Sequence, residues 1–267
     1  MRKLPVAIQL FSVRNEAEKD FRGTMAAIKE MGYDGVELAG LYGKTPDEIK
    51  AILDEVGLQL VSAHEPVADL VQDKMLDAYA SMGLKYIVIP WMSLVPEEAA
   101  VNEAIETIRG IAVRVQERGM QLLYHNHDFE FAKVNGAYIL DTFYASVSPD
   151  LLQTEIDTCW ANVGGENPAA FLRKYTGRSP IVHLKDFVGQ KTENMYALIG
   201  NSAQKEEATQ AFDFRPVGYG VQDIPAIVEA SVEIGAKWLV VEQDRPALDK
   251  TALECAKMSI DYLNTVL

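Results

Sequence analysis

Short apolar runs alternate along the chain with longer stretches whose apolar residues recur at helical spacing. At five places a helical stretch stops at a glycine and an apolar run begins one or two residues later; these are Gly32, Gly57, Gly83, Gly119 and Gly235. Glycine suits the left-handed residue that ends a helix, and a continuous apolar run suits a strand that is buried on both faces. A strand–helix unit repeated in this way is typical of a parallel α/β protein.

Eight strand–helix units can be traced, which is the number that a closed (β/α)₈ barrel contains. We expect strands at residues 6–12, 35–38, 58–64, 86–91, 121–125, 152–157, 181–185 and 238–243. We expect helices at residues 20–31, 46–56, 69–82, 96–118, 137–145, 168–175, 224–234 and 251–266. Because such a barrel takes roughly 250 residues, the 267-residue chain is predicted to form a single α/β domain, a (β/α)₈ TIM barrel spanning residues 1–267.

The overall charge and the cysteines narrow the choice of partners and compartment. The net charge is −14, which disfavours nucleic acid and anionic membranes because both require a basic surface. No stretch is long and apolar enough to cross a bilayer, and the first residues do not resemble a signal peptide. The two cysteines, Cys159 and Cys255, lie far apart and provide no disulfide framework. We therefore expect a cytoplasmic protein; the sequence leaves open whether it forms a homo-oligomer.

Four consecutive predicted strands each bring an imidazole or a carboxylate to their carboxyl end, where α/β barrels build their active sites. These strand ends read YHNHDFEF at residues 124–131, EIDTCW at 155–160, HLKD at 183–186 and VEQD at 241–244. Mixed nitrogen and oxygen donors on rigid strands can surround a divalent cation while leaving positions open for substrate. A polar rim and helix-capping aspartates would explain any one of these residues, but four in succession favour a metal site.

Several motifs together resemble the sugar phosphate isomerase/epimerase family, a group of xylose isomerase-like TIM barrels. They are residues 124–131 (YHNHDFEF), 157–161 (DTCWA), 183–186 (HLKD) and 242–244 (EQD), with further similarity at 8–14 and 214–220. The resemblance extends over essentially the whole chain. It is specific for the superfamily and not for the reaction, because the superfamily includes isomerases, epimerases, dehydratases and lyases.

The resemblance implies one divalent metal ion, with Mn, Co, Mg and Zn all compatible with the mixed donors. Epimerases of the family hold their metal with Glu, Asp, His and Glu from strands 5 to 8, and Asp157, His183 and Glu242 match the last three. At the first position this chain has His125, and Glu130 is the alternative ligand. In those epimerases the two glutamates also move the proton, so a histidine at the first position departs from that mechanism.

The chemistry that fits such a site is removal of a proton from the carbon next to a carbonyl, with an enediolate as the intermediate. We predict a metal-dependent sugar isomerase or epimerase. A lyase or dehydratase acting on a keto-sugar or a 3-keto-glycoside is the first alternative, and a non-catalytic sugar-binding barrel is the second. An abasic-site endonuclease of the same fold is excluded, since it would need more histidines than four and a basic surface. No glycine-rich phosphate loop is present, which favours an unphosphorylated sugar.

Other residues near the strand ends are candidates for proton transfer or substrate contact. Lys185 shares a strand face with His183 and could act as an acid or form only a salt bridge. Glu37 lies inside an apolar strand, which is costly unless the carboxylate is paired or faces the site. The segment 187–222 is long enough to be a lid over the substrate. The candidates for proton transfer are Glu242, Lys185, His127 and His64, and those for substrate contact are Gln9, Glu37, Trp91, Trp160 and Glu130.

Overall fold

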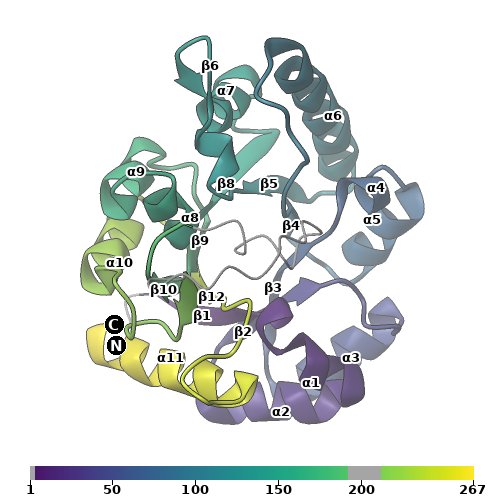
Figure 1. The fold of residues 1–267 in the computed structure, drawn as a ribbon. Helices are drawn as coiled ribbons and strands as arrows, with labels where there is room; N and C mark the ends of the chain where they lie inside the picture. Colours follow the sequence, from purple (N-terminus) through teal and green to yellow (C-terminus); the bar gives the residue numbers. More distant parts are fainter. Residues whose placement is uncertain (1–3, 192–211) are drawn as a thin grey trace.

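The computed structural model describes residues 4–191 and 212–267, and in them eight parallel strands close into a barrel surrounded by helices (Figure 1). The strands, in their order around the barrel, are β1 (Val6–Gln9), β2 (Gly35–Ala39), β3 (Gln59–His64), β4 (Tyr86–Ile89), β5 (Gln121–His125), β8 (Leu152–Asp157), β9 (Ile181–Leu184) and β12 (Trp238–Val241). The first strand closes the barrel by pairing with the last, in a register that places Val6 opposite Leu239. The predicted (β/α)₈ TIM barrel is confirmed.

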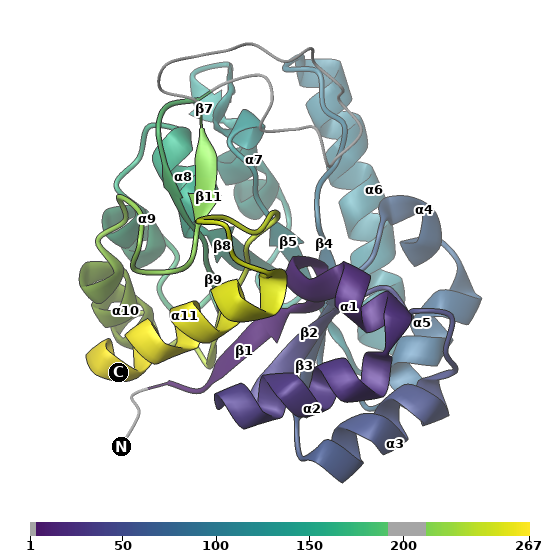
Figure 2. The same ribbon diagram turned by 60° about the horizontal axis from the view of Figure 1, so that its bottom comes forward.

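The helices form the outer layer and cover the strands on all sides (Figures 1 and 2). They are η1 (Leu10–Val13), α1 (Arg14–Lys19), α2 (Phe21–Met31), α3 (Pro46–Val56), α4 (Val67–Leu70), α5 (Asp73–Ser81), α6 (Glu98–Glu117), η2 (Phe129–Phe131), α7 (Ile139–Ser146), α8 (Thr158–Val163), α9 (Pro168–Lys174), α10 (Ile224–Glu233) and α11 (Ala252–Val266). No helix in the described part of the chain is long and apolar enough to span a membrane.

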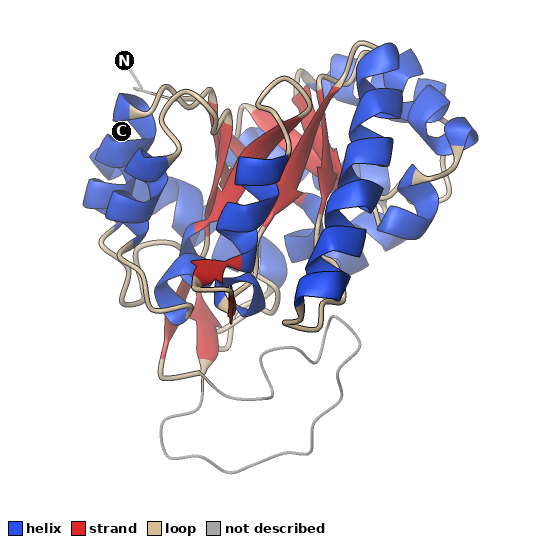
Figure 3. Cartoon of the chain, turned by 90° about the horizontal axis from the view of Figure 1, so that it is seen from above, coloured by secondary structure: helices blue, strands red, loops and turns tan. Residues whose placement is uncertain are grey.

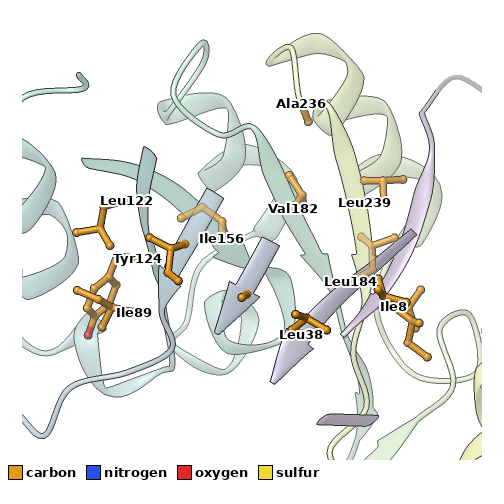
Figure 4. Packing of buried hydrophobic residues seen from close by; sticks show 14 of the residues in the cluster. Ile8, Leu38, Ile89, Leu122, Tyr124, Ile156, Val182, Leu184, Ala236 and Leu239 are labelled. Carbon is orange, nitrogen blue, oxygen red and sulfur yellow. The ribbon is translucent and has the colours of Figure 1, made fainter. Parts of the chain in front are cut away.

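Alternate side chains on each strand point outwards and pack beneath the helices, because successive side chains of a strand face opposite sides. Figure 4 shows this layer, which includes Ile8, Leu38, Ile89, Leu122 and Val182. The residues are buried, and the core they form continues into the inner faces of the helices. This packing fixes each strand in register with its neighbours and so fixes the positions of the strand ends.

The remaining side chains fill the inside of the barrel in two levels. The lower level is apolar and consists of Ala7, Val61, Tyr86, Val88, Leu123, Ile181 and Val240. On four of the strands the side chain two residues further along, which points to the same face, is polar: Ala7 is followed by Gln9, Leu123 by His125, Ile181 by His183 and Val240 by Glu242. The barrel therefore has an apolar base and a polar layer at the carboxyl ends of its strands.

Several predicted elements differ from the structure, among them the first strand and two of the helices. The first strand ends at Gln9 and not at residue 12, because the Gln9 side chain accepts a hydrogen bond from Phe11 N and caps η1. The predicted helix 69–82 is divided into α4 and α5 by residues 71–72. In the predicted helix 137–145, residues 137–138 instead form β7 (Ala137–Tyr138), which pairs with β6 (Lys133–Val134).

A short antiparallel hairpin follows β9 and projects beyond the end of the barrel (Figure 3). It pairs β10 (Asp186–Val188) with β11 (Asp213–Arg215). The Asp186 carboxylate accepts hydrogen bonds from the backbone N–H groups of Phe187, Gly218, Gly220 and Gln222, and so fixes the loop after β11. The predicted lid lies within residues 187–222, and its central part, 192–211, lies outside the described residues.

Candidate functional site

Four buried side chains meet at the carboxyl end of the barrel, each from a different strand. They are the four residues predicted to bind metal, His125, Asp157, His183 and Glu242, and we call them the upper group. His125 Nε2 lies 3.4 Å from Asp157 Oδ2 and 3.6 Å from Glu242 Oε2, and His183 Nδ1 lies 3.1 Å from the same Glu242 oxygen. The donor atoms are thus close enough together to contact one ion.

The upper group has unsatisfied atoms that fit a cation. His125 Nε2 and Asp157 Oδ2 are buried and have no hydrogen-bond partner, and a buried polar atom without a partner costs free energy. Burial lowers the pKa of His125 and of His183, but the surrounding carboxylates outweigh it and raise both pKa values. These imidazoles and the Lys185 ammonium compensate the carboxylates, and a divalent ion would take the place of the imidazole protons. Imidazole nitrogens and carboxylate oxygens are ligands that zinc and related divalent ions accept. The residues present therefore fit a divalent metal.

The ammonium group belongs to Lys185, which follows β9 and is buried. Its Nζ lies 2.9 Å from Asp244 Oδ1, 3.0 Å from Glu242 Oε2 and 3.4 Å from Asp157 Oδ2. Burial by itself lowers the pKa of Lys185, but the carboxylates of Asp244 and Glu242 outweigh it and raise that pKa well above its usual range. The rings of Trp160 and Phe214 lie 5.1 and 5.6 Å from the ammonium nitrogen. The sequence left two alternatives for Lys185, a role in the site or a salt bridge alone. In the structure Lys185 forms the salt bridges and also lines the cavity.

A second group of four side chains lies beside the upper group and shares His183 with it. It contains Glu37, His64, Glu155 and His183, and we call it the lower ring. Burial alone lowers the pKa of His64, but the charges of Glu37 and Glu155 raise it to about 10. Burial in turn raises the pKa of Glu37, and the imidazoles of His64 and His183 reverse this and lower it well below its usual range. The lower ring is thus a buried set of mutually compensating charges.

A cavity of about 460 Å³ opens above these groups at the carboxyl ends of the strands. Four predicted catalytic residues, His64, His127, Lys185 and Glu242, line it, together with both predicted tryptophans, Trp91 and Trp160. Gln9, Glu37 and Glu130, predicted to contact substrate, are not among the described residues that line the cavity. All three are buried, and Gln9 Nε2 donates to Glu37 Oε1 at 2.8 Å.

Two residues of the YHNHDFEF motif have separate roles. The ring of His127 lies between those of Phe129 and Trp160, with both centroid distances 5.2 Å. Burial and the nearby His125 and Lys185 charges lower its pKa well below the usual value, so it is neutral at neutral pH. Glu130 lies outside both groups; it accepts hydrogen bonds from Tyr124 OH and His127 N, and burial raises its pKa to about 7. The structure therefore brings His125, and not Glu130, to the other three predicted ligands.

Two acidic residues of the site were not singled out in the sequence. Glu155 lies two residues before Asp157 on β8, so the period of two places both on the inner face, and this spacing could have identified it. Asp244 follows the last strand by three residues and lines the cavity beside Lys185. Its contact depends on the path of the loop after β12, for which the sequence contains no local signal.

Comparisons with known proteins agree with this architecture. Residues 25–264 match the family described as xylose isomerase-like TIM barrel. The inosose dehydratase of Geobacillus kaustophilus (strain HTA426) is 24% identical over 270 residues, which cover 91% of this chain and 86% of that protein. A sugar phosphate isomerase/epimerase from Parabacteroides distasonis has a TM-score of 0.77 at 21% identity, with 98% of this chain and 94% of that chain covered. The IOLI protein with a binding zinc atom has a TM-score of 0.71 at 15% identity, with 99% of each chain covered.

Proposed function

Because this chain belongs to the xylose isomerase-like TIM barrel family, we propose that it is a divalent-metal-dependent enzyme that removes a proton from the carbon next to the carbonyl of a sugar-type substrate. The observation that supports this most strongly is the upper group, four buried donors at the edge of the cavity with His125 Nε2 and Asp157 Oδ2 lacking hydrogen-bond partners. A barrel that only bound sugar would have no need for such a donor set.

The cavity suits a small polyhydroxylated ligand. Its volume of about 460 Å³ falls within the range of roughly 300–1,000 Å³ that is usual for small-molecule sites. The rings of Trp91 and Trp160 provide apolar wall on which a sugar ring can pack. Charged and imidazole groups are concentrated near the upper group, so the reacting end of the substrate would lie there.

The chain's own residues divide the chemistry between them. A divalent ion held by the upper group would act as a Lewis acid on the substrate carbonyl and a neighbouring hydroxyl. The Glu242 carboxylate is ionised, since burial raises its pKa but the neighbouring Lys185 ammonium lowers it further, and it lines the cavity as the proposed base. The Lys185 ammonium, packed against Trp160 and Phe214, would stabilise the negative charge that develops on the substrate oxygen.

We propose that the reaction proceeds by β-elimination from a keto-sugar, with loss of water or of an aglycone. Within the described residues, Glu242 is the one carboxylate of the upper group that lines the cavity, and strand β5 contributes the imidazole of His125 to this group and not a further carboxylate. Elimination needs one base and one proton donor, whereas epimerisation needs proton carriers on both faces of the substrate. The name of the inosose dehydratase relative supports the same reaction class.

Isomerisation or epimerisation through an enediolate, the reaction placed first from the sequence, is the second candidate. It begins with the same deprotonation and differs only in returning the proton to carbon. The neutral imidazole of His127 in the cavity wall is the observation that favours it, because this group could carry the returning proton.

The test is to incubate the metal-loaded protein in deuterated water with unphosphorylated sugars, keto-inositols and 3-keto-glycosides, and to follow products by NMR and mass spectrometry. Release of water or aglycone with formation of an unsaturated ketone is the expected result. Deuterium at a sugar carbon without loss of a substituent would replace elimination by isomerisation or epimerisation. Neither change across the panel, with metal bound in full, would overturn the enzymatic proposal and favour a sugar-binding role.

A further inference from the structure

The lower ring has a geometry that ties two histidines to the same pair of oxygen atoms. His64 Nε2 lies 2.6 Å from Glu155 Oε1 and 3.1 Å from Glu37 Oε1. His183 Nε2 lies 2.8 Å from Glu37 Oε1 and 3.1 Å from Glu155 Oε1. Each carboxylate therefore uses one oxygen to contact both imidazoles, and a shift of either carboxylate would move both rings.

Beyond the lower ring, the imidazole of His183 faces the upper group and that of His64 faces the cavity. His183 presents its Nδ1 to the upper group, 3.1 Å from Glu242 Oε2. His64 has its Nε2 directed to the carboxylates and lines the cavity. The lower ring consequently connects a proposed metal ligand with a residue of the substrate cavity. Partners of this kind on the far nitrogen of a ligating histidine fix its orientation.

The two glutamates of the ring differ in how they are held. Glu37 is anchored from outside the ring by Gln9 Nε2 and by the Ser62 hydroxyl, which donates to the second oxygen, Oε2. Glu155 Oε2 is buried and has no hydrogen-bond partner, and the polar contacts of the Glu155 side chain in the described residues are to the two imidazoles. A buried carboxylate oxygen without a partner is costly, so packing alone does not explain a glutamate at this position.

The contacts inside the ring have hydrogen-bond lengths. They join an imidazole nitrogen to a carboxylate oxygen at 2.6–3.1 Å. The two carboxylates therefore hold both imidazole rings through hydrogen bonds.

We propose that Glu155 is a positioning residue, which orients His183 toward the metal and His64 toward the substrate through one shared oxygen. The inference rests on the proposed function, because that function makes His183 a metal ligand. The residue does not touch the reacting atoms; it acts through the two imidazoles. Replacement of its carboxylate should therefore change the metal site without removing any ligand.

The experiment is a Co²⁺ titration of the metal-free protein, followed by visible absorption, with Glu155→Gln, Glu155→Asp and Ser62→Ala. Loss of such a supporting partner typically costs about 10–100-fold in metal affinity, and we expect this loss for Glu155→Gln, with a changed cobalt spectrum because the His183 ring is no longer fixed. The matched control Ser62→Ala removes the hydrogen bond to Glu37 Oε2, which touches neither imidazole. Glu37 Oε1 keeps the Gln9 donor and its contacts with both imidazoles, so the carboxylate stays in place and the variant should bind cobalt as the parent does.

The outcomes separate the inference from the proposed function. Parent affinity and parent spectrum in Glu155→Gln would overturn the positioning role, and so would a second cobalt equivalent that disappears in that variant. If Glu155→Gln does not fold, Glu155→Asp decides: it keeps the charge but shortens the reach, and it should bind more weakly than the parent with an altered spectrum. A parent protein that takes up no cobalt would overturn the proposed function itself and this inference with it.

Discussion

The Lys185 ammonium contacts two carboxylates that would hold the metal, those of Asp157 and Glu242. Replacing this lysine therefore tests its role in metal binding and in catalysis separately. In Lys185→Met the apolar part of the side chain is retained while the ammonium beside Asp157, Glu242 and Asp244 is lost. Metal affinity should stay equal or rise, because a competing cation is gone. The turnover number should fall by about 10²–10³-fold, the usual cost of removing a group that stabilises developing negative charge.

The measurement is metal content and steady-state kinetics on the same preparation, with Lys174→Met as the matched control. Lys174 is a partly exposed lysine that pairs with Asp141 away from the cavity, and its replacement should leave both quantities unchanged. Parent-like turnover in Lys185→Met would remove the lysine from the proposed chemistry.

Glu130 predicts a dependence of stability on pH. Burial raises its pKa to about 7 from the usual 4.5, so above about pH 5 the unfolded chain releases the proton while the folded protein retains it. Its contribution to stability therefore falls as the pH rises and levels off above about pH 7, with a total loss on the order of 3 kcal/mol.

In Glu130→Gln the group cannot ionise, and the amide can still accept from His127 N and contact Tyr124 OH. The free energy of unfolding of both metal-free proteins can be measured with urea from about pH 5 to about pH 8. Over this range the variant should become more stable relative to the parent by on the order of 2–3 kcal/mol. Parallel profiles would show that Glu130 titrates normally in the folded protein.

The Asp186 carboxylate holds the loop after β11, and Gly220 in this loop allows the backbone to come close to that carboxylate. A Cβ on Gly220 would overlap Asp186 Oδ1 and the Phe187 carbonyl oxygen. Gly220→Ala should therefore lower the free energy of unfolding by about 1–3 kcal/mol, as other overpacked sites do. Gln222 in this loop donates to the Lys185 carbonyl. A displacement of the loop in Gly220→Ala should therefore also displace Lys185 in the site.

Gly110 offers the matched control within a helix. It is exposed in α6, and a Cβ there would meet no atom within 4 Å. Gly110→Ala should raise the free energy of unfolding by about 0.5–1 kcal/mol, since alanine restricts the unfolded chain and favours the helix. Chemical denaturation of both variants gives the comparison, and a Gly220→Ala protein as stable as the parent would contradict the packing argument.

The elements that were predictable are those whose signal is local. The helix α3 begins at a capping box formed by Thr45 and Glu48 and ends at the left-handed Gly57, and both signals are visible in the sequence. The break between α4 and α5 lacks such punctuation. The short helix α8 was not predicted although Asp157 caps its start and Gly164 follows its end. The period of two along the strands fixed which side chains face inwards, and therefore placed His125, Asp157, His183 and Glu242 together.

At the scale of the whole molecule, the barrel and the family resemblance are both confirmed. Closure of the barrel could be inferred from eight repeated units, because each unit adds one parallel strand to the sheet. The sharing of oxygens between His64 and His183 depends on β3 and β9 facing each other across the barrel interior, a long-range relation that no sequence window contains. This is why the predicted ligands came from the sequence while the supporting role of Glu155 required the structure.

The central claim is that the upper group holds a divalent metal ion, and the metal content of the parent and of His125→Ala tests it most directly. His125 belongs to the upper group and not to the lower ring, so its loss removes a ligand and leaves the supporting network intact. After equilibration with Zn²⁺ or Mn²⁺ and dialysis, the parent should retain about one ion per chain and the folded variant much less. A parent without bound metal, or a variant that retains as much as the parent, would contradict the account.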